Sequence, residues 1–305
     1  MAARAPTAVV HLIWQPAGPA PFNAFLGSYE CHQSDSEHEL VLLYNGFDGA
    51  QSMDSFRERA ADLRPRELVL EERCLDLAAY ARAAYELEHE RLCFVNSYSE
   101  ITTPGWLALL EAALAEPGAG AAGASGSWAS HLSYSLFQLG LPGAYAKAFD
   151  SRRAARTAMH ELSGTRVPGA LSNWLYTFGT VGWRLRGSSL FPSPHLRTNG
   201  LLVDRVLFGD LCRGRADTKR ATYRLESGPQ SITARLQVHG RQPVVVDTHG
   251  MVRHAADWHL GDGFFQADQR DLLITDNQTR TYAAATAAQR RALSSLAWGP
   301  RARPA

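Results

Sequence analysis

Cysteines are scarce in this chain and widely separated. Four occur among 305 residues, at positions 31, 74, 93 and 212, and no two of them form a C-x-x-C pair. This spacing argues against a disulfide framework and against a zinc site built from cysteine doublets. We therefore expect reduced, mostly buried thiols in a soluble cytoplasmic protein.

An excess of either charge and long apolar runs are also missing. Lys and Arg total 31 and Asp and Glu total 30, so no broad field exists to hold a nucleic acid or an anionic membrane. The uncharged stretch 167–183 contains Pro168, Asn173 and several glycines, which a membrane-spanning helix tolerates poorly. We expect no nucleic-acid partner and no transmembrane segment. The basic segment 151–162 could face phospholipid, although a solvated helix face is the commoner reading.

Short apolar runs alternate with helical patterns in the first half of the chain. Four runs have the length of buried strands: residues 9–14, 40–44, 67–70 and 92–95. Helices are predicted from Asp76 and from Thr103-Pro104, which are residue types that open helices. This alternation predicts an α/β fold with a parallel sheet flanked by helices, in which ligands bind beyond the carboxyl ends of the strands. The small-residue segment 119–127 is predicted to be a strand and tight turn.

The pattern changes from about Thr218. Short strands, such as residues 242–247, alternate with polar loops, and a last helix is expected over residues 283–296. We divide the chain into a nucleotide-binding core, residues 1–217, and a C-terminal acceptor or lid part, residues 218–305. Both parts are expected to belong to one catalytic domain.

Polar residues follow the fourth predicted strand, in the segment NSYSE at positions 96–100, and a second distinctive segment, FPSPHLRTNG, occupies positions 191–200. In these segments the chain resembles GT-A glycosyltransferases. The second is similar to a Pro-x-Pro-His-x-Arg-Thr-Asn stretch in a bacterial branch of that group, often found with polysaccharide genes. Members of the group hold a divalent metal on an Asp-x-Asp motif after this strand. Here Asn96-Ser97-Tyr98 replaces that motif, so the carboxylates are missing.

The resemblance implies transfer of a sugar from a nucleoside-diphosphate sugar to a hydroxyl-bearing glycan or small-molecule acceptor, with inversion. It places the following residues on the donor side: Pro16, Asn45, Asp76, Asn96, Tyr98, His195, Arg197, Asn199 and Arg280. Alternation in an extended segment would put the three residues at positions 195, 197 and 199 on one face. Arg suits phosphate, and Asn suits a sugar hydroxyl. The plainer alternatives are a polar network that braces the turn after Pro194, and helix or strand capping by Asp76, Asn96 and Tyr98.

Glu226 is the candidate catalytic base. Its segment resembles the site where inverting members place a carboxylate at the head of a helix, and a carboxylate in a closed cleft gains basicity from desolvation. A charge that favours the helix dipole is the plainer alternative. Asp204 is the reserve candidate.

The missing carboxylates predict an enzyme that holds no metal cofactor of its own. Mg²⁺ or Mn²⁺ would then enter with the diphosphate of the donor, and Arg280, in the polar cluster 276–282, would supply positive charge. A capped helix start that braces the final helix is the alternative for that cluster. The histidines at positions 249, 254 and 259 are spaced unsuitably for one helix face and are expected to be scattered loop residues.

Two other functions stay open at this point. A nucleotidyltransferase shares the strand and helix pattern, although its Gly-rich loop and Lys are not seen near Pro16. A catalytically inactive protein that binds glycans or a partner enzyme would explain the loss of the acidic motif. No G-x-G-x-x-G opens a Rossmann helix, and the phosphate-loop and G-x-S-x-G signatures are absent from the sequence.

Overall fold

The computed structural model describes residues 5–139, 187–213 and 218–303, together with positions 153, 157, 158, 161 and 162. The uncharged stretch 167–183 and most of the basic segment 151–162 lie outside these residues. No helix in the described part is both long and apolar enough to cross a membrane.

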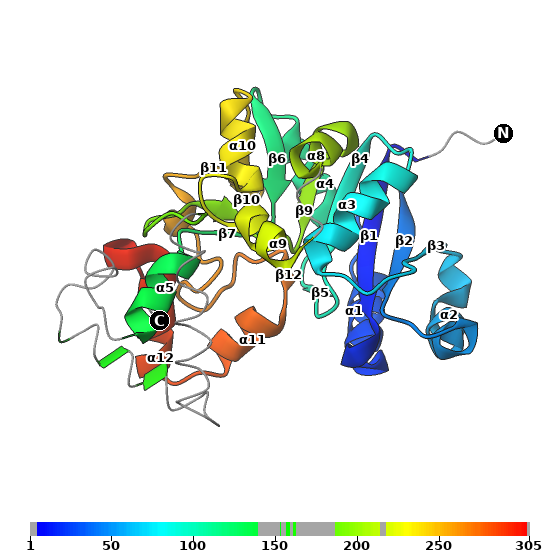
Figure 1. Cartoon of the computed structure of the whole chain (residues 1–305), viewed down its shortest axis with the longest axis horizontal. Helices are drawn as coiled ribbons and strands as arrows, with labels where there is room; N and C mark the ends of the chain where they lie inside the picture. The colour runs from blue at the N-terminus through cyan, green and yellow to red at the C-terminus, as the bar shows by residue number, and fades with distance from the viewer. Residues whose placement is uncertain are drawn as a thin grey trace.

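Within the described residues, eight strands form a central sheet with helices on both faces (Figure 1). Their order across the sheet is β11-β10-β6-β9-β4-β1-β2-β3. The bounds are β1 (Thr7–Trp14), β2 (His38–Asn45), β3 (Arg66–Val69), β4 (Arg91–Val95), β6 (Ala119–Gly123), β9 (Leu201–Asp204), β10 (Gln242–Val246) and β11 (Val252–His254). The six predicted strands are therefore confirmed, as is the α/β fold class.

Strand direction matches the prediction in most of the sheet. β1 runs parallel to β2 and β4, β2 to β3, and β6 to β10. β9 is the exception in the middle, because it pairs antiparallel with both β4 and β6. The chain therefore enters β9 at the edge of the sheet where β4 and β6 end.

Alternating side chains of the buried strands divide the core into two layers. Ala8 and Val10 pack with α3 (Asp76–Glu86), α8 (Arg205–Cys212) and α10 (Ile232–Val238). Val9 and Ile13 face α1 (Pro19–Cys31), α2 (Asp54–Ala60) and α4 (Trp106–Leu114) on the other side. Each fully buried Val or Ile side chain contributes about 1.5–3 kcal/mol. The period of two in β1 thus produces a helix–sheet–helix sandwich.

The C-terminal part completes the sheet instead of standing apart from it. β10 pairs with β6, and β11 extends the edge, so residues on both sides of position 218 share one sheet. The last helix, predicted over residues 283–296, is confirmed as α12 (Ala287–Trp298), and a separate helix, α11 (Asn277–Ala283), precedes it. Thr286 caps α12 through the backbone N–H of Gln289, which is why the chain restarts there.

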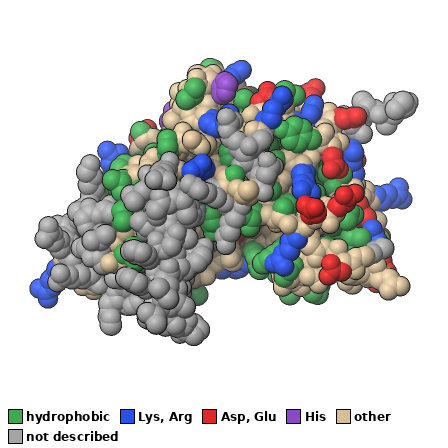
Figure 2. Space-filling view, in the orientation of Figure 1, with side chains coloured by type: hydrophobic (Ala, Val, Ile, Leu, Met, Phe, Trp, Pro, Cys, Tyr) green, Lys and Arg blue, Asp and Glu red, His purple; other side chains and the backbone are tan. Residues whose placement is uncertain are grey.

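Further elements complete the described part of the chain. They are β5 (Glu100–Ile101) paired with β12 (Ile274–Thr275), β7 (Gly126–Ser127) paired with β8 (His195–Leu196), α5 (His131–Gln138), α9 (Lys219–Glu226), and the 3₁₀ turns η1 (Gln15–Ala17), η2 (Ala50–Met53), η3 (Ala61–Leu63), η5 (Trp258–Leu260) and η6 (Gly299–Arg301). Charges of both signs are mixed over the described part of the face in Figure 2, as the balanced composition predicts. Cys93 and Cys212 are buried free thiols, Cys74 is partly buried and Cys31 is exposed.

Candidate functional site

The segment before β9 brings polar residues to the carboxyl edge of the sheet. Gly200 starts this entry: its backbone N–H donates to the carbonyl of Phe94 at 2.8 Å. Its φ is +71°, and a Cβ there would lie 2.6 Å from the Cβ of Ala124. Only glycine fits such a position without strain. Residues 195–199 are thereby held beside the end of β4.

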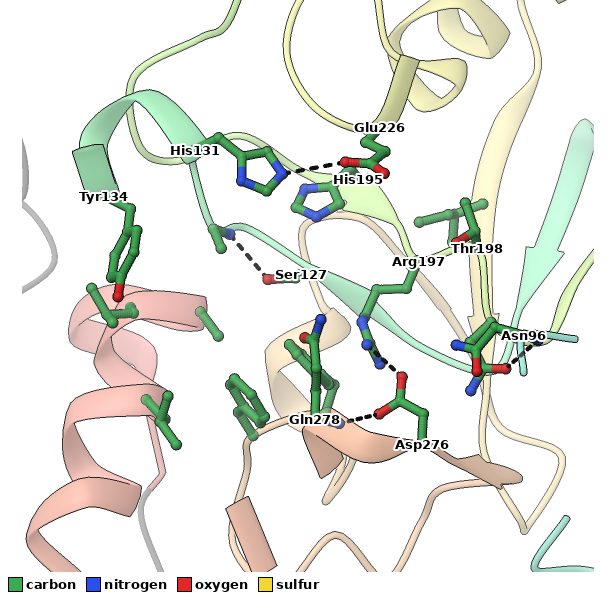
Figure 3. Close-up of a pocket in the computed structure, with 18 of the residues that line it drawn as sticks. Asn96, Ser127, His131, Tyr134, His195, Arg197, Thr198, Glu226, Asp276 and Gln278 are labelled. Carbon is green, nitrogen blue, oxygen red and sulfur yellow. Dashed lines mark hydrogen bonds and ion pairs between the residues drawn. The ribbon is translucent and has the colours of Figure 1, made fainter. Parts of the chain in front are cut away.

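A cavity of about 310 Å³ lies at this edge. Figure 3 shows how separate elements contribute to it: His131 and Tyr134 come from α5, Glu226 from α9, and Gln278 from α11. This volume is at the lower end of the range for small-molecule pockets. The cavity is our candidate active site.

Six of the residues predicted from the sequence line this cavity. They are Asp76, Asn96, His195, Arg197, Asn199 and Glu226. The other five, Pro16, Asn45, Tyr98, Asp204 and Arg280, do not line it. Among the described lining residues, three carboxylates (Asp76, Glu226 and Asp276) stand against one guanidinium, that of Arg197.

Asn45 and Pro16 lie at the ends of β2 and β1, outside the cavity. The Asn45 amide donates to the carbonyl of Cys74 at 2.8 Å, and its oxygen accepts from the Cys74 N–H at 3.1 Å. It thus fixes the loop that leads into α3. Pro16 is exposed in η1.

Arg280 holds the turn after β4 instead of reaching into the cavity. Its guanidinium forms an ion pair with Glu100 at 2.7 Å and donates to the backbone carbonyl of Tyr98 at 3.0 Å. The positive charge predicted to replace a metal already has a carboxylate partner. Its use for a diphosphate would require that pair to open.

Asp204 lies at the edge of the sheet opposite the cavity, which argues against Asp204 as the reserve candidate for the catalytic base. Because β9 runs antiparallel, its last residue pairs with Arg91 at the start of β4. The exposed Asp204 carboxylate accepts the N–H of Leu207 at 2.8 Å and caps α8. It is a helix cap with no access to the cavity.

Glu226 ends a helix, and the prediction that it stands at a helix head is wrong. It is the last residue of α9, so its charge is not placed to favour the helix dipole. Its carboxylate lies 3.6 Å from Nε2 of His131. Both side chains are partly exposed, so this contact within the cavity lining is accessible to solvent (Figure 3).

Asp76 shares the cavity with Glu226. Its Oδ1 accepts the N–H of Leu77 at 2.9 Å. Asp76 is the first residue of α3, while the N-cap position is Leu75 and has no side-chain cap, so the alternative of Asp76 as an N-cap is wrong. Burial, followed by the negative charge of Glu226, raises the pKa of Asp76 to about 6. A carboxylate of this kind changes its protonation close to neutral pH.

His195 is a neutral hydrogen-bond acceptor toward the cavity. Its Nδ1 lies 2.8 Å from the carbonyl of Ser193, and because a carbonyl only accepts, Nδ1 must carry the proton. Burial lowers the pKa of His195 to about 4, so Nε2 is unprotonated at pH 7. This nitrogen can accept from a sugar hydroxyl but offers no positive charge to phosphate.

Arg197 is braced from two sides. Its guanidinium lies 2.6 Å from Asp276 and 4.0 Å from the ring centroid of Phe264. Burial opposes ionisation of Asp276, but the charge of Arg197 and the hydrogen bonds from Thr279 outweigh it and lower its pKa. Asp276 also caps α11 through a capping box with Thr279. The capped-helix alternative for the 276–282 cluster is therefore confirmed.

Asn96 and Asn199 form a polar network at the end of β4. Oδ1 of Asn96 accepts from the Tyr98 N–H at 2.9 Å and from the Ser99 hydroxyl at 3.1 Å. Oδ1 of Asn199 accepts from the Asn96 N–H at 3.3 Å and from Ser99. Both residues line the cavity. Asn96 caps the end of β4, as its capping alternative predicts, and Asn199 belongs to a hydrogen-bonded polar network, as its own alternative predicts.

Sequence reasoning missed several lining residues, above all His131, Tyr134 and Phe264. No motif marks them, because each reaches the cavity only through the packing of its helix or loop. The described residues contain no cluster of three or more His, Cys, Asp or Glu side chains suited to a metal ion. Of the late histidines, His259 packs on Trp128, with ring centroids 5.1 Å apart, and His249 is exposed.

Comparison with known proteins gives partial matches. No protein-family model and no curated protein matches the chain. Over 40% of its length it is similar to a mannosyltransferase, PcManGT from Pyrobaculum calidifontis in complex with GDP-Man and Mn²⁺, at 16% identity and a TM-score of 0.33 over 36% of that protein. S. aureus TarS in complex with UDP-GlcNAc matches 38% of the chain at 16% identity and a TM-score of 0.31 over 33% of its own length. GalNAc-T7 with UDP, GalNAc and Mn²⁺ matches 40% of the chain at 14% identity, with a TM-score of 0.32, over 23% of its own length.

These matched regions span about a third or less of the solved proteins. Likeness at such TM-scores identifies no donor, acceptor or mechanism. The chemistry of the cavity has to supply those inferences.

Proposed function

We propose that the cavity is the active site of a glycosyltransferase, which moves a sugar from a nucleoside-diphosphate sugar to a hydroxyl acceptor with inversion. One observation carries the proposal. At the carboxyl edge of a largely parallel sheet, a guanidinium suited to phosphate and carboxylates suited to proton transfer face one cavity of about 310 Å³.

Three lining residues are suited to binding the donor. Arg197 would contact the diphosphate, sharing its guanidinium with Asp276. His195 and Asn199 would hold sugar hydroxyls: Nε2 of His195 accepts, and one amide hydrogen of Asn199 is left after its contact with the Thr275 carbonyl. Arg197 in particular would stabilise charge that develops on the leaving diphosphate.

The reaction itself is a single displacement, and this accounts for inversion. The acceptor O–H bond breaks and its proton passes to a carboxylate, for which Glu226 is the candidate predicted from the sequence. The acceptor oxygen forms a bond to the anomeric carbon. The bond from that carbon to the diphosphate breaks, and its electron pair leaves with the nucleoside diphosphate.

The position of the missing acidic motif does not fit a divalent cation. Asn96 and Tyr98 are neutral, and the Asn96 oxygen already accepts two hydrogen bonds. Hard cations prefer carboxylate ligands. We therefore keep the proposal that the protein provides no metal site of its own.

A binding protein without catalysis is the second candidate, and the charge of the cavity favours it. Three carboxylates face one guanidinium that is already paired with Asp276. Such a cavity disfavours a polyanion more than a neutral glycan. Turnover separates the two functions, since a binding protein releases no nucleoside diphosphate.

The test is a turnover screen. UDP-glucose, UDP-N-acetylglucosamine and GDP-mannose would be incubated with the protein, with water and simple glycosides as acceptors, in Mg²⁺ and in EDTA. We expect release of nucleoside diphosphate from one donor class, and activity in EDTA within a few-fold of that in Mg²⁺. Release that needs added Mn²⁺ would contradict metal independence, and no release from any donor would favour the binding protein.

A further inference from the structure

Two carboxylates from distant parts of the sequence meet in the cavity. Asp76 opens α3, Glu226 ends α9, and these two helices pack against each other. Both side chains line the same cavity of about 310 Å³. Two carboxylates that share a cleft are candidates for proton transfer.

The two carboxylates differ in what already holds them. Glu226 faces His131 at 3.6 Å, a contact that becomes an ion pair when His131 is protonated. Asp76 receives one backbone N–H, from Leu77, through Oδ1. Among the described residues no side chain donates to Asp76, so its second oxygen is available to a ligand in the cavity.

We propose that Asp76 is the catalytic residue that takes the proton of the acceptor, and that Glu226 is a positioning residue acting through it. This inference rests on the proposed glycosyl transfer and changes the role of Asp76, which the resemblance assigned to the donor nucleotide. In the step, the acceptor O–H bond breaks, the proton moves to the free oxygen of Asp76, and the acceptor oxygen bonds to the anomeric carbon. The electron pair of the broken bond to the diphosphate leaves with the nucleoside diphosphate.

The electrostatics of the cavity agree with this assignment. A general base works best when its pKa lies near the working pH, and burial together with Glu226 raises the pKa of Asp76 to about 6. Asp76 influences the pKa of Cys74 and Tyr80. The titratable and charged groups that line the cavity with Asp76 are Glu226, His131, His195, Arg197 and Asp276. Burial raises the pKa of both Cys74 and Tyr80, so these two are neutral at pH 7. Glu226 is therefore the neighbour whose removal should change Asp76 most.

The first test needs no turnover. Protein labelled with ¹³C at the aspartate carboxyl carbons would be titrated by NMR, and the Asp76 signal identified by its loss in Asp76→Asn. We expect a midpoint near pH 6 in the wild type and a lower midpoint in Glu226→Gln, which removes the neighbouring charge. A midpoint near pH 4 in both proteins would overturn the pairing.

The second test separates catalysis from donor binding. Release of nucleoside diphosphate from UDP-glucose, UDP-N-acetylglucosamine and GDP-mannose would be followed from pH 5 to pH 9, and binding of UDP and GDP measured separately. We expect Asp76→Asn to lower kcat about 10²–10⁴-fold, the usual worth of a general base, with nucleotide affinity within about threefold. Glu226→Gln should shift the acid limb of the profile to lower pH. Asp62→Asn, an exposed carboxylate on η3, is the matched control and should change nothing.

The outcomes are distinguishable. If Asp76→Asn weakens UDP or GDP binding and leaves kcat and the acid limb unchanged, Asp76 belongs to the donor site and the inference is wrong. If the wild type releases nucleoside diphosphate from none of the three donors, the proposed function fails and the catalytic role with it, even where the NMR titration shows the pair. Because Glu226→Gln leaves Asp76 in place, its pH profile still decides the question should Asp76→Asn fold poorly.

Discussion

Arg197→Ala tests whether Arg197 braces the cavity, contacts phosphate, or does both. In the free protein its guanidinium faces Asp276 at 2.6 Å, and the two side chains are 12% and 1% exposed. Removal of the guanidinium leaves a buried carboxylate without its ion-pair partner. The backbone N–H groups of Gln278 and Thr279 still donate to that carboxylate.

The expected loss of stability follows from that burial. Breaking a buried ion pair from one side costs about 3–5 kcal/mol, and the lost stacking on Phe264 adds about 0.5–2 kcal/mol. The surviving cap offsets part of this, so we expect about 3 kcal/mol at pH 7. The pKa of Asp276 is lowered in the folded protein, so the pair contributes stability above the ordinary pKa of the carboxyl and loses it as pH falls through the lowered one. The difference between variant and wild type should therefore shrink at acid pH.

Urea unfolding at pH 7 and at pH values well below 3.8, the ordinary pKa of the carboxyl, measures both effects, and Arg270→Ala is the matched control. Arg270 pairs with Asp268 at 3.1 Å, but its side chain is 78% exposed, so we expect a loss below about 1 kcal/mol. A loss below about 1 kcal/mol for Arg197→Ala too would refute the bracing role. If Arg197 also contacts phosphate, the variant should bind UDP or GDP about tenfold or more weakly while the free nucleoside is affected less. Equal losses for both ligands would favour bracing alone.

Three further perturbations test separate parts of the account. Both ring nitrogens of the buried His11 lack hydrogen-bond partners among the described residues, and burial lowers the pKa of His11 to about 3 from 6.5. Only the unfolded state therefore protonates this residue as pH falls below 6.5, so the folded protein loses stability over that range. Between pH 7 and pH 5 the wild type should lose about 2 kcal/mol more in urea unfolding than His11→Leu, and equal losses would contradict that pKa. Asp204→Ala should cost about 1 kcal/mol for the lost cap of α8 without reducing turnover, whereas an inactive but folded variant would restore the reserve role. Glu226→Gln should leave UDP or GDP affinity unchanged and turnover at pH 7 within a few-fold of the wild type while the acid limb moves to lower pH, because Glu226 acts through Asp76; a loss of about 10²-fold or more with an unmoved limb would make Glu226 the base.

The sheet could be predicted from the sequence because its signals are local. Buried parallel strands require short apolar runs, and Val9–Trp14 and Leu92–Val95 show them directly. The antiparallel direction of β9 has no local signal, because strand direction depends on how the chain returns to the sheet. That direction separates Asp204 from the cavity and brings Arg197 into it.

The candidate site could be predicted only in part. His195 and Arg197 stand out because polar residues alternate in a short segment between apolar ones. The sequence does not show that Asp276 partners Arg197, that Glu100 partners Arg280, or that His131 faces Glu226. Each of these pairs joins segments that only tertiary packing brings together. Several residues predicted to contact a ligand, such as Asn45 and Arg280, instead hold neighbouring loops in the structure.

The most direct test of the central claim is calorimetric titration of UDP-glucose, UDP-N-acetylglucosamine and GDP-mannose into the wild type and into Arg197→Ala. Parallel titrations would be run in EDTA and in Mg²⁺. We expect one donor class to bind at a single saturable site per chain, to bind in EDTA as well, and to bind about tenfold or more weakly to the variant. No saturable binding of any nucleotide sugar under either condition, or equal affinity for both proteins, would contradict a donor site in this cavity.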